Sequence, residues 1–372
     1  MSIQNNPHAE TIKTDIAIIG GGSAGITLAT KLKHQTSVVI EPKTPEQRDV
    51  SWALWATENH QKEIAAATKG RWNKWRLIDH KHEIIHKSDK YHYTSLSSAD
   101  YLRHCENKLS SNISLVRESA DNIIAEGNGG TFTAAGKKYF AHHIYDSRPA
   151  KLDENGLKQH FLGIEIRTKK PLNEVDIATL MDFRVDQSKG LHFIYALPFS
   201  ERTLLIESTM ISATLEPKEW YKQGIYQWLD DQSIEIEEIT REEYGVIPMH
   251  ETTPEDTKLM RIGSASGAVR LSSGYAFTNI QAQISQLAAN IERGEFSVPQ
   301  VISSNINQLD KIYNSVLIAN PTLGVELMMK TAGALDADGF SRFMLGKATF
   351  KDWIRVILAM PKIPFLTQVF RL

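Results

Sequence analysis

The chain has 372 residues, 41% of them hydrophobic and 23% charged, with a formal net charge of -2. This composition is typical of a globular protein with one large domain or two, and the near-neutral balance excludes a general attraction to nucleic acid, so no nucleic-acid partner is predicted. Cys105 is the only cysteine, which excludes an internal disulfide and a cysteine-based zinc site. Residues 1–14 lack the apolar middle of a signal peptide, and no uncharged run reaches the ~20 residues of a membrane-spanning helix. A cytoplasmic protein is therefore predicted.

The region 15–34 has the pattern of a strand, a glycine turn and a helix. Residues 16–19 form a short apolar run, typical of a buried parallel strand, and G-x-G-x-x-G spacing follows. Gly20 is expected to allow the sharp turn, Gly22 to let a pyrophosphate approach the backbone, and Gly25 to let helix and strand pack closely. The phosphates are expected at the helix N-terminus, where free N–H groups favour negative charge.

A second β-rich run, 37–40, is followed by Glu41, at the position of a ribose-binding acid. A lone G-x-G-x-x-G is weak evidence, and a glycine turn with no nucleotide is the alternative. The second strand and its terminal acid favour a dinucleotide site. A helix from Ser98 to about Leu109 and short strands up to Asp146 continue the alternation expected of a nucleotide-binding domain.

Four of the tryptophans lie between Trp52 and Trp75. Trp52 and Trp55 are three residues apart, a spacing that fits one face of a buried helical turn or a stacking surface for an apolar ligand. Core packing is the simpler interpretation of the spacing alone. Trp72 and Trp75 repeat it among basic residues, where an amphipathic helix is favoured over a site for single-stranded nucleic acid. The histidines at 80–92 lack metal-ligand spacing such as H-E-x-x-H, so no metal site is predicted.

From Gln159 onward, strand-like runs separated by turns indicate a largely antiparallel sheet. Three of them contain an isolated acid within apolar surroundings: Glu165, Asp182 and Glu207. Such an acid either faces solvent on an alternating strand or is buried with a raised pKa, the property of a general acid. The continuous apolar run 204–206 favours burial of Glu207, and both interpretations stay open for Glu165 and Glu207. The acidic run 235–243 is interpreted as a solvated face.

A second glycine-bearing element covers residues 261–277, with a long helix predicted from Ile280 to about Arg293. A strand, a glycine loop and a helix again present backbone N–H groups to a ligand. Two glycine loops on either side of a β-rich insertion indicate FAD, which spans a longer path across the protein than NAD does in a domain that binds NAD alone.

The last 70 residues are predicted to be helical, with 353–360 in the core and 361–372 in contact with a membrane surface. The predicted fold class is α/β, with a Rossmann-like FAD-binding domain, a mainly antiparallel β substrate domain and C-terminal helices. The FAD-binding domain is assigned to 1–50, 98–158 and 256–300. The substrate domain is assigned to 51–97 and 159–255, and the helical segment to 301–372.

Taken together, these segments resemble the lycopene cyclase family, flavoproteins that close the ends of a linear carotene. The resemblance covers most of the chain in the right order. Its most specific elements are F-x-G-x-E, ending at Glu165, and S-G-Y-x-F at 273–277. The other matching elements are the dinucleotide fingerprint and the segments 51–55, 146–149, 180–184, 195–199, 207–209 and 241–248.

The resemblance implies bound FAD, used in its reduced form without net oxidation of an apolar polyene substrate. It also implies an acid that protonates a terminal alkene, attack on the cation by a neighbouring double bond, and loss of a proton to leave a β-ionone ring. The family's essential acid maps onto Glu165, and the acid of the plant F-L-E-E-T element maps approximately onto Glu207, with Asp182 as a third candidate. NAD(P)H or another reductant is implied for the flavin, and peripheral membrane contact for the protein.

The residues predicted to bind the cofactor are Gly20, Gly22, Gly25, Glu41, Arg103, Asp146, Gly263, Gly267 and Gly274. Those predicted to contact the substrate are Trp52, Trp55 and Tyr275. The sequence departs from the family at Leu54, Leu271 and Ser264, which bears on the substrate more than on the fold. A flavin-dependent monooxygenase or oxidase acting on an apolar isoprenoid or polyene is the alternative on the same fold, and a carotenoid carrier is a third class.

Overall fold

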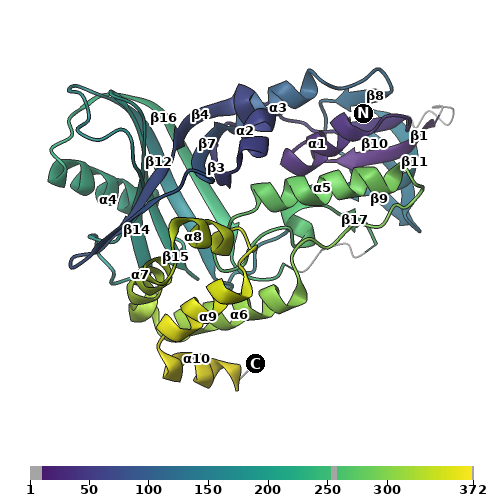
Figure 1. Ribbon diagram of the computed structural model, residues 1–372. Coiled ribbons are helices and arrows are strands. Elements are labelled where there is room, and N and C mark those ends of the chain that lie inside the picture. Colours follow the sequence, from purple (N-terminus) through teal and green to yellow (C-terminus); the bar gives the residue numbers. More distant parts are fainter. Residues whose placement is uncertain (1–10, 253–257, 371–372) are drawn as a thin grey trace.

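The computed structural model describes residues 11–252 and 258–370, and Figure 1 shows their arrangement. The N-terminal sheet has the strand order β8-β2-β1-β11-β10-β9, with β17 also paired to β11. Pairing is parallel among β8, β2, β1, β11 and β17 and antiparallel for β10 and β9. The strands are β1 (Ile12–Ile19), β2 (Ser37–Ile40), β8 (Ile113–Val116), β9 (Asp121–Glu126), β10 (Gly129–Ala134), β11 (Lys137–Asp146) and β17 (Met260–Arg261).

Three helices accompany this sheet: α1 (Ser23–Lys31), α3 (Ser98–Glu106) and α5 (Phe277–Ile291). Apolar residues of β1, α1 and α5 form one buried cluster, in which Ile18, Leu28 and Ile284 are fully enclosed. Burial of the strand on this face explains why its sequence is continuously apolar rather than alternating. The predicted strand, turn and helix are therefore confirmed, as is the helix after the second glycine loop.

The second large sheet has the order β16-β12-β15-β14-β13-β5-β6 and is antiparallel except between β13 and β5. This confirms the four strand-like runs and the mainly antiparallel architecture. The strands are β5 (Lys74–Ile78), β6 (Glu83–Lys87), β12 (Lys158–Thr168), β13 (Ala178–Asp182), β14 (Leu191–Ser200), β15 (Thr203–Ser212) and β16 (Ile236–Pro248).

Both faces of this sheet are covered, and the alternation along each strand decides which side chains meet which layer. Helix α4 (Lys218–Asp231) packs on one face, where Ile164 and Ile206 are buried against Tyr221. The opposite face carries Phe161, Gly163 and Glu165 on β12, and Leu205, Glu207 and Thr209 on β15. Glu207 therefore points away from α4 although the residues on either side of it are buried beneath that helix.

A small sheet, β3-β7-β4, joins the two large ones through β3 (Ser51–Ala56), β4 (Thr68–Trp72) and β7 (His92–Ser97). The helical interpretations of both tryptophan pairs are wrong. Trp52 and Trp55 lie on β3, while Trp72 ends β4 and Trp75 lies on β5. Helix α2 (Glu58–Ile64) and the 3-10 turns η1 (Glu46–Arg48) and η2 (Ala65–Ala67) complete this region.

The C-terminal segment is helical, as predicted. It contains α6 (Ser304–Ala319), η4 (Pro321–Leu323), α7 (Gly324–Ala334), α8 (Ala337–Met344), α9 (Phe350–Ala359) and α10 (Lys362–Val369). Residues from α7, α8 and α9 share a buried cluster with Trp75, Leu205 and Phe193 of the central sheet. Figure 1 shows α9 and α10 at the end of the molecule away from β1. No helix in the described part of the chain is long and apolar enough to cross a bilayer.

Candidate active site

A cavity of about 1480 Å³ runs from the N-terminal glycine turn to the face of the antiparallel sheet that lies away from α4. Its lining includes Gly20 and Gly22 at one end, and Phe161, Tyr195 and Glu207 at the other. It therefore joins the predicted cofactor site to the strands that carry the predicted acids.

The three glycines of the first turn occupy different steric environments. Gly20 has φ +98°, the left-handed region that favours glycine. A Cβ on Gly25 would lie 2.0 Å from the carbonyl oxygen of Gly20, so this glycine permits close packing of helix on strand. A Cβ on Gly22, at the N-cap of α1, would meet no atom within 4 Å, which leaves space for a ligand at the helix N-terminus. This cradle fits a pyrophosphate group.

Glu41 closes the same end of the cavity. Its Oε2 accepts the Gly21 N–H at 2.9 Å and its Oε1 accepts the Lys43 N–H at 3.0 Å. Arg48 Nη1 donates to the Gly21 carbonyl oxygen at 2.9 Å and to Glu41 Oε2 at 3.2 Å. The sequence did not single out Arg48, because it lies in a charged loop outside both glycine elements, yet it lines the cavity.

The second glycine element forms the neighbouring wall. Gly263 opens the 3-10 turn η3 (Gly263–Ser266), and its N–H donates to Gln283 Oε1 at 2.8 Å. Gly263, Gly267 and Gly274 all have positive φ and line the cavity. A Cβ on Gly263 would lie 2.8 Å from Ala24 Cβ, so η3 approaches α1 closely at this point.

Three of the predicted cofactor residues, Gly25, Arg103 and Asp146, lie outside the lining. Arg103 is exposed on α3 and pairs with Glu46 at 2.7 Å and Asp100 at 2.6 Å, whereas Arg48, Arg148 and Arg261 line the cavity. Asp146 is fully buried and accepts hydrogen bonds from Arg148 Nε and Nη2, both at 2.9 Å. Arg148 lines the cavity, and Asp146 is placed to orient the Arg148 side chain without lining the cavity itself.

Glu207 is a buried carboxyl in the cavity wall, which settles its environment in favour of burial. Burial, followed by the negative charge of Glu243, raises its pKa well above the ordinary value of a glutamate. Such a shift favours the protonated form of the carboxyl. Glu243, interpreted from sequence as part of a solvated face, is buried too, and its neighbours Glu237, Glu238 and Glu242 remain exposed.

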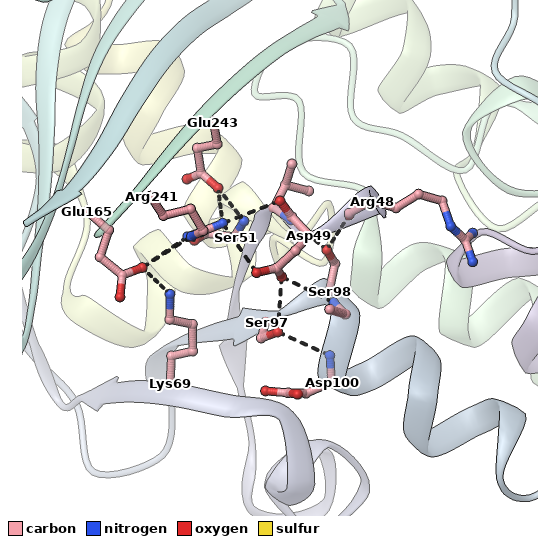
Figure 2. A network of polar contacts seen from close by, with 12 residues as sticks. Arg48, Asp49, Ser51, Lys69, Ser97, Ser98, Asp100, Glu165, Arg241 and Glu243 are labelled. Carbon is pink, nitrogen blue, oxygen red and sulfur yellow. Dashed lines mark hydrogen bonds and ion pairs between the residues drawn. The ribbon is translucent and has the colours of Figure 1, made fainter. Parts of the chain in front are cut away.

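Glu165 sits in a network of ion pairs, which Figure 2 shows beside β12. Lys69 from β4 contacts its Oε2, and Arg241 from β16 approaches the same oxygen at 3.1 Å. Arg241 also donates to Glu243 Oε2 at 2.8 Å and to Ser51 Oγ at 2.7 Å. Glu165 does not line the cavity. It is placed to anchor β12 to β4 and β16.

Asp182 is also an ion pair rather than a cavity residue. Arg184 binds both of its oxygens, at 2.9 and 2.6 Å, and Trp228 Nε1 donates to Oδ2 at 2.9 Å. Burial opposes ionisation, but these hydrogen bonds outweigh it and hold the pKa of Asp182 below its ordinary value. The catalytic assignment of Asp182 is corrected to a structural one, because its carboxylate faces α4 and is fully partnered.

Asp182→Asn is accordingly expected to lower the free energy of unfolding by about 1–3 kcal/mol, because it breaks charged hydrogen bonds in a buried setting. A folded-state pKa below the unfolded value gives stability that is present above the unfolded value and is lost as pH falls through the folded one. Urea unfolding at neutral and acidic pH should therefore show a difference between wild type and variant that shrinks on acidification. An equal difference at both pH values would contradict the assignment.

Aromatic side chains form the wall between the two ends of the cavity. Of the three residues predicted to contact the substrate, Trp52 and Tyr275 line the cavity, whereas Trp55 does not. Trp55 is fully buried behind Tyr275, with ring centroids 4.9 Å apart, so its assignment is corrected to core packing. Sequence reasoning missed Tyr93 and Tyr195, which also line the cavity. The Tyr93 hydroxyl lies 2.9 Å from that of Tyr195 and 3.1 Å from that of Tyr275.

The glycine cradle joined to an antiparallel substrate sheet defines an FAD-dependent oxidoreductase-type fold. A flavoprotein/dehydrogenase from Cytophaga hutchinsonii has a similar structure, with a TM-score of 0.62 and 15% identity over 91% of this chain and 93% of that one. The chain belongs to the lycopene cyclase family, whose model, lycopene cyclase protein, matches residues 15–369.

Two bacterial relatives illustrate this membership. Lycopene beta-cyclase from Pantoea ananas is 28% identical over 225 residues, an alignment that covers 57% of this chain and only 58% of that protein. Lycopene beta-cyclase from Pseudescherichia vulneris is 21% identical over 376 aligned positions, covering 94% of this chain and 95% of that protein.

Proposed function

We propose that the protein is an FAD-dependent cyclase that closes a β-ionone-type ring on lycopene or a related polyene, with Glu207 as the proton donor. The observation that carries the proposal is a buried carboxyl whose pKa is raised, set in the wall of a cavity that also contains the dinucleotide cradle. Membership of the lycopene cyclase family supports the substrate class.

The reaction balances without an oxidant. The terminal double bond of the substrate takes the proton of Glu207, and its electron pair forms the new C–H bond. The adjacent carbon becomes cationic, and a neighbouring double bond attacks it to form the ring C–C bond. Loss of a proton from the ring to the Glu207 carboxylate restores a double bond and the acid. The product has the mass of the substrate.

The surroundings of Glu207 suit a carbocation. Burial raises the pKa values of Tyr93, Tyr195 and Tyr275 well above that of a free phenol, so their rings stay neutral. Neutral aromatic faces attract cations and do not trap them as a water molecule would. Trp52 adds an indole to the same lining.

At the end of the cavity next to the first glycine turn, the glycines and charged residues fit FAD. Gly22 and the N-terminus of α1 would hold the pyrophosphate, Glu41 the ribose, and the turn Gly263–Gly267 would present backbone N–H groups to the flavin end. When bound and reduced by NAD(P)H or another donor, FAD would supply electron density that favours a cation. The chain's own residues carry the proton.

The test is anaerobic incubation of the purified protein with reduced FAD and lycopene, followed by mass spectrometry and absorption spectroscopy of the product. An isomer of unchanged mass with a blue-shifted spectrum is expected, because ring closure consumes an isolated terminal double bond and twists the ring double bond out of the plane of the polyene. A product heavier by oxygen, formed only in air, would instead establish the monooxygenase alternative.

We also propose that α9 and α10 contact a membrane that supplies the apolar substrate. Their exposed apolar residues are Phe350, Ile354, Ile357, Leu358, Ile363, Leu366, Val369 and Phe370. Val356 and Met360 face inward and secure α9 to the core. The prediction that 353–360 completes the core thus holds for one side of α9 only. Lys351 and Lys362 are exposed beside these residues and suit an anionic surface.

The double variant L358E/I363E is expected to reduce sedimentation with anionic vesicles at least about tenfold without changing the melting temperature, since both side chains are more than 70% exposed. The matched control is I124E, which alters an exposed apolar residue of β9. Equal loss of vesicle binding in the control, or unchanged binding in the double variant, would refute the assignment to α9 and α10.

A further inference from the structure

We propose that Glu243 is a proton-positioning residue of the acid site: it shares one proton with Glu207 across Gly163, remains ionised itself, and thereby keeps the proton on the carboxyl that faces the cavity. The consequence for ring closure rests on the proposed function. The shared proton is a property of the protein alone and can be tested without substrate.

The backbone register brings the two carboxyls together. Gly163 on β12 is paired with Glu207 on β15 and with Glu243 on the opposite neighbour, β16. A Cβ on Gly163 would lie 2.8 Å from Glu207 Cγ, 3.1 Å from Glu243 Cγ and 3.4 Å from Glu243 Oε1. The two acids therefore lean over the glycine from either side, into space that any other residue would fill.

The hydrogen-bond partners of Glu243 leave one place for a proton. Its Oε2 accepts the Ser51 N–H at 2.7 Å and Arg241 Nη1 at 2.8 Å. Its Oε1 is buried, and no donor to it is found among the described residues. A buried carboxylate oxygen without a donor is costly, and a protonated Glu207 supplies the missing one.

The charges around the pair favour one proton rather than none. The titratable and charged groups that face it are Arg241 on β16, Lys69 on β4, Glu165 on β12, Asp49 ahead of β3, Tyr195 on β14, Tyr93 on β7 and Tyr275 of the second glycine element. With Glu243 ionised, three carboxylates already surround two cations. Ionising Glu207 would add a fourth carboxylate in a buried setting, whereas Arg241 bonds directly to Glu243 and stabilises its charge.

This arrangement serves both proton steps. While Glu243 is ionised, Glu207 keeps its proton at neutral pH. Once the proton has passed to the alkene, two buried carboxylates face each other, and their repulsion makes Glu207 a stronger base for the proton that the ring must lose. The same carboxyl can then donate and recover the proton.

The decisive measurement is a pH titration of the protein without substrate, following the protonated-carboxyl band by infrared difference spectroscopy. Wild type is expected to keep a protonated carboxyl at neutral pH, and Glu207→Gln to lose that band. Glu243→Gln should shift its midpoint down by about two pH units, a hundredfold fall in proton affinity, because a neighbouring charge is removed. Glu242→Gln, on the opposite face of β16 and paired with Lys222, is the matched control.

Two further variants keep the test informative if Glu243→Gln does not fold. Glu243→Asp retains the charge and should preserve the neutral-pH band. Gly163→Ala inserts a Cβ between the carboxyls and should lower the midpoint. An unchanged midpoint in both Glu243→Gln and Gly163→Ala would overturn the proposal, as would survival of the neutral-pH band in Glu207→Gln.

Turnover separates positioning from the chemical role. Glu243→Gln is expected to lose about tenfold or more of kcat at neutral pH and to recover as the pH falls and Glu207 regains its proton. Glu207→Gln should not recover at any pH. If wild type cyclises no polyene, the proposed function fails while the infrared midpoints still decide the shared proton. If wild type cyclises and the midpoints do not move, only the shared proton fails.

Discussion

Replacing Glu207 with glutamine is expected to lower kcat for ring closure by about 10²–10⁴-fold, the usual contribution of a positioned general acid, while the protein folds and retains FAD. Glutamine has the shape of a protonated glutamic acid but has no proton acidic enough to give to an alkene. Among the described residues, Glu207 forms no ion pair that the change would break, and it lines the cavity from β15, whereas the glycine cradle lies between β1 and α1. Anaerobic single-turnover assays with reduced FAD measure this step directly.

Glu165→Gln provides the comparison that separates the two predicted acids. It weakens the contacts to Lys69 and Arg241 and should lower stability, with a smaller effect on the chemical step because Glu165 does not line the cavity. Glu242→Gln should match wild type in both respects. An active Glu207→Gln beside a folded, flavin-bound but inactive Glu165→Gln would transfer the proton-donor role to Glu165.

The two acids look alike in sequence, and their difference is a matter of long-range contacts. Each is an isolated acid in an apolar strand, and alternation within β12 and β15 places both on the face away from α4. What separates them lies elsewhere in the chain: Lys69 on β4 and Arg241 on β16 form salt bridges to Glu165, whereas Glu207 has none within the part of the chain that the structure describes. The local sequence pattern could identify both carboxyls as candidate acids, but it could not predict which distant residues form ion pairs with them.

Glu243 is buried within a segment that is exposed on average, so a prediction made for the whole segment is wrong for this residue. The run 235–243 is acidic and mostly exposed, as predicted, because β16 is the edge strand of its sheet. Its inner end, however, passes beside Ser51 and over Gly163, where alternation turns Arg241 and Glu243 inward. The period-two placement of an arginine and an acid ahead of Gly245 is the sequence signal that could have indicated a buried pair.

The tryptophan pair illustrates the opposite error, in which a spacing was assigned the wrong period. Three residues apart on a helix share a face, but on a strand they point to opposite sides. On β3, Trp52 therefore lines the cavity while Trp55 packs in the core behind Tyr275. The glycine turn was predictable in more detail because its steric requirements are local, set by the strand, the helix and the turn between them.

Those local steric requirements lead to a second prediction: alanine substitutions at Gly22 and Gly25 should affect different properties of the protein. Gly25→Ala is expected to destabilise the fold by about 1–3 kcal/mol or more, because its Cβ would lie 2.0 Å from the Gly20 carbonyl oxygen. Gly22→Ala should change the stability of the FAD-free protein by less than about 1 kcal/mol, since φ of -67° suits alanine and a Cβ there meets no protein atom within 4 Å.

Gly22→Ala should nevertheless weaken FAD binding about tenfold or more, because the new methyl group occupies the space in which the pyrophosphate approaches the helix N-terminus. Thermal unfolding of the FAD-free proteins and fluorescence titration with FAD separate the two effects. Normal FAD affinity in a stable Gly22→Ala protein would mean that the phosphates lie elsewhere in the cavity. Loss of FAD binding in a stable Gly22→Ala protein would assign the space beside Gly22 to the cofactor. Loss of stability in Gly25→Ala would assign Gly25 to the packing of α1 on β1.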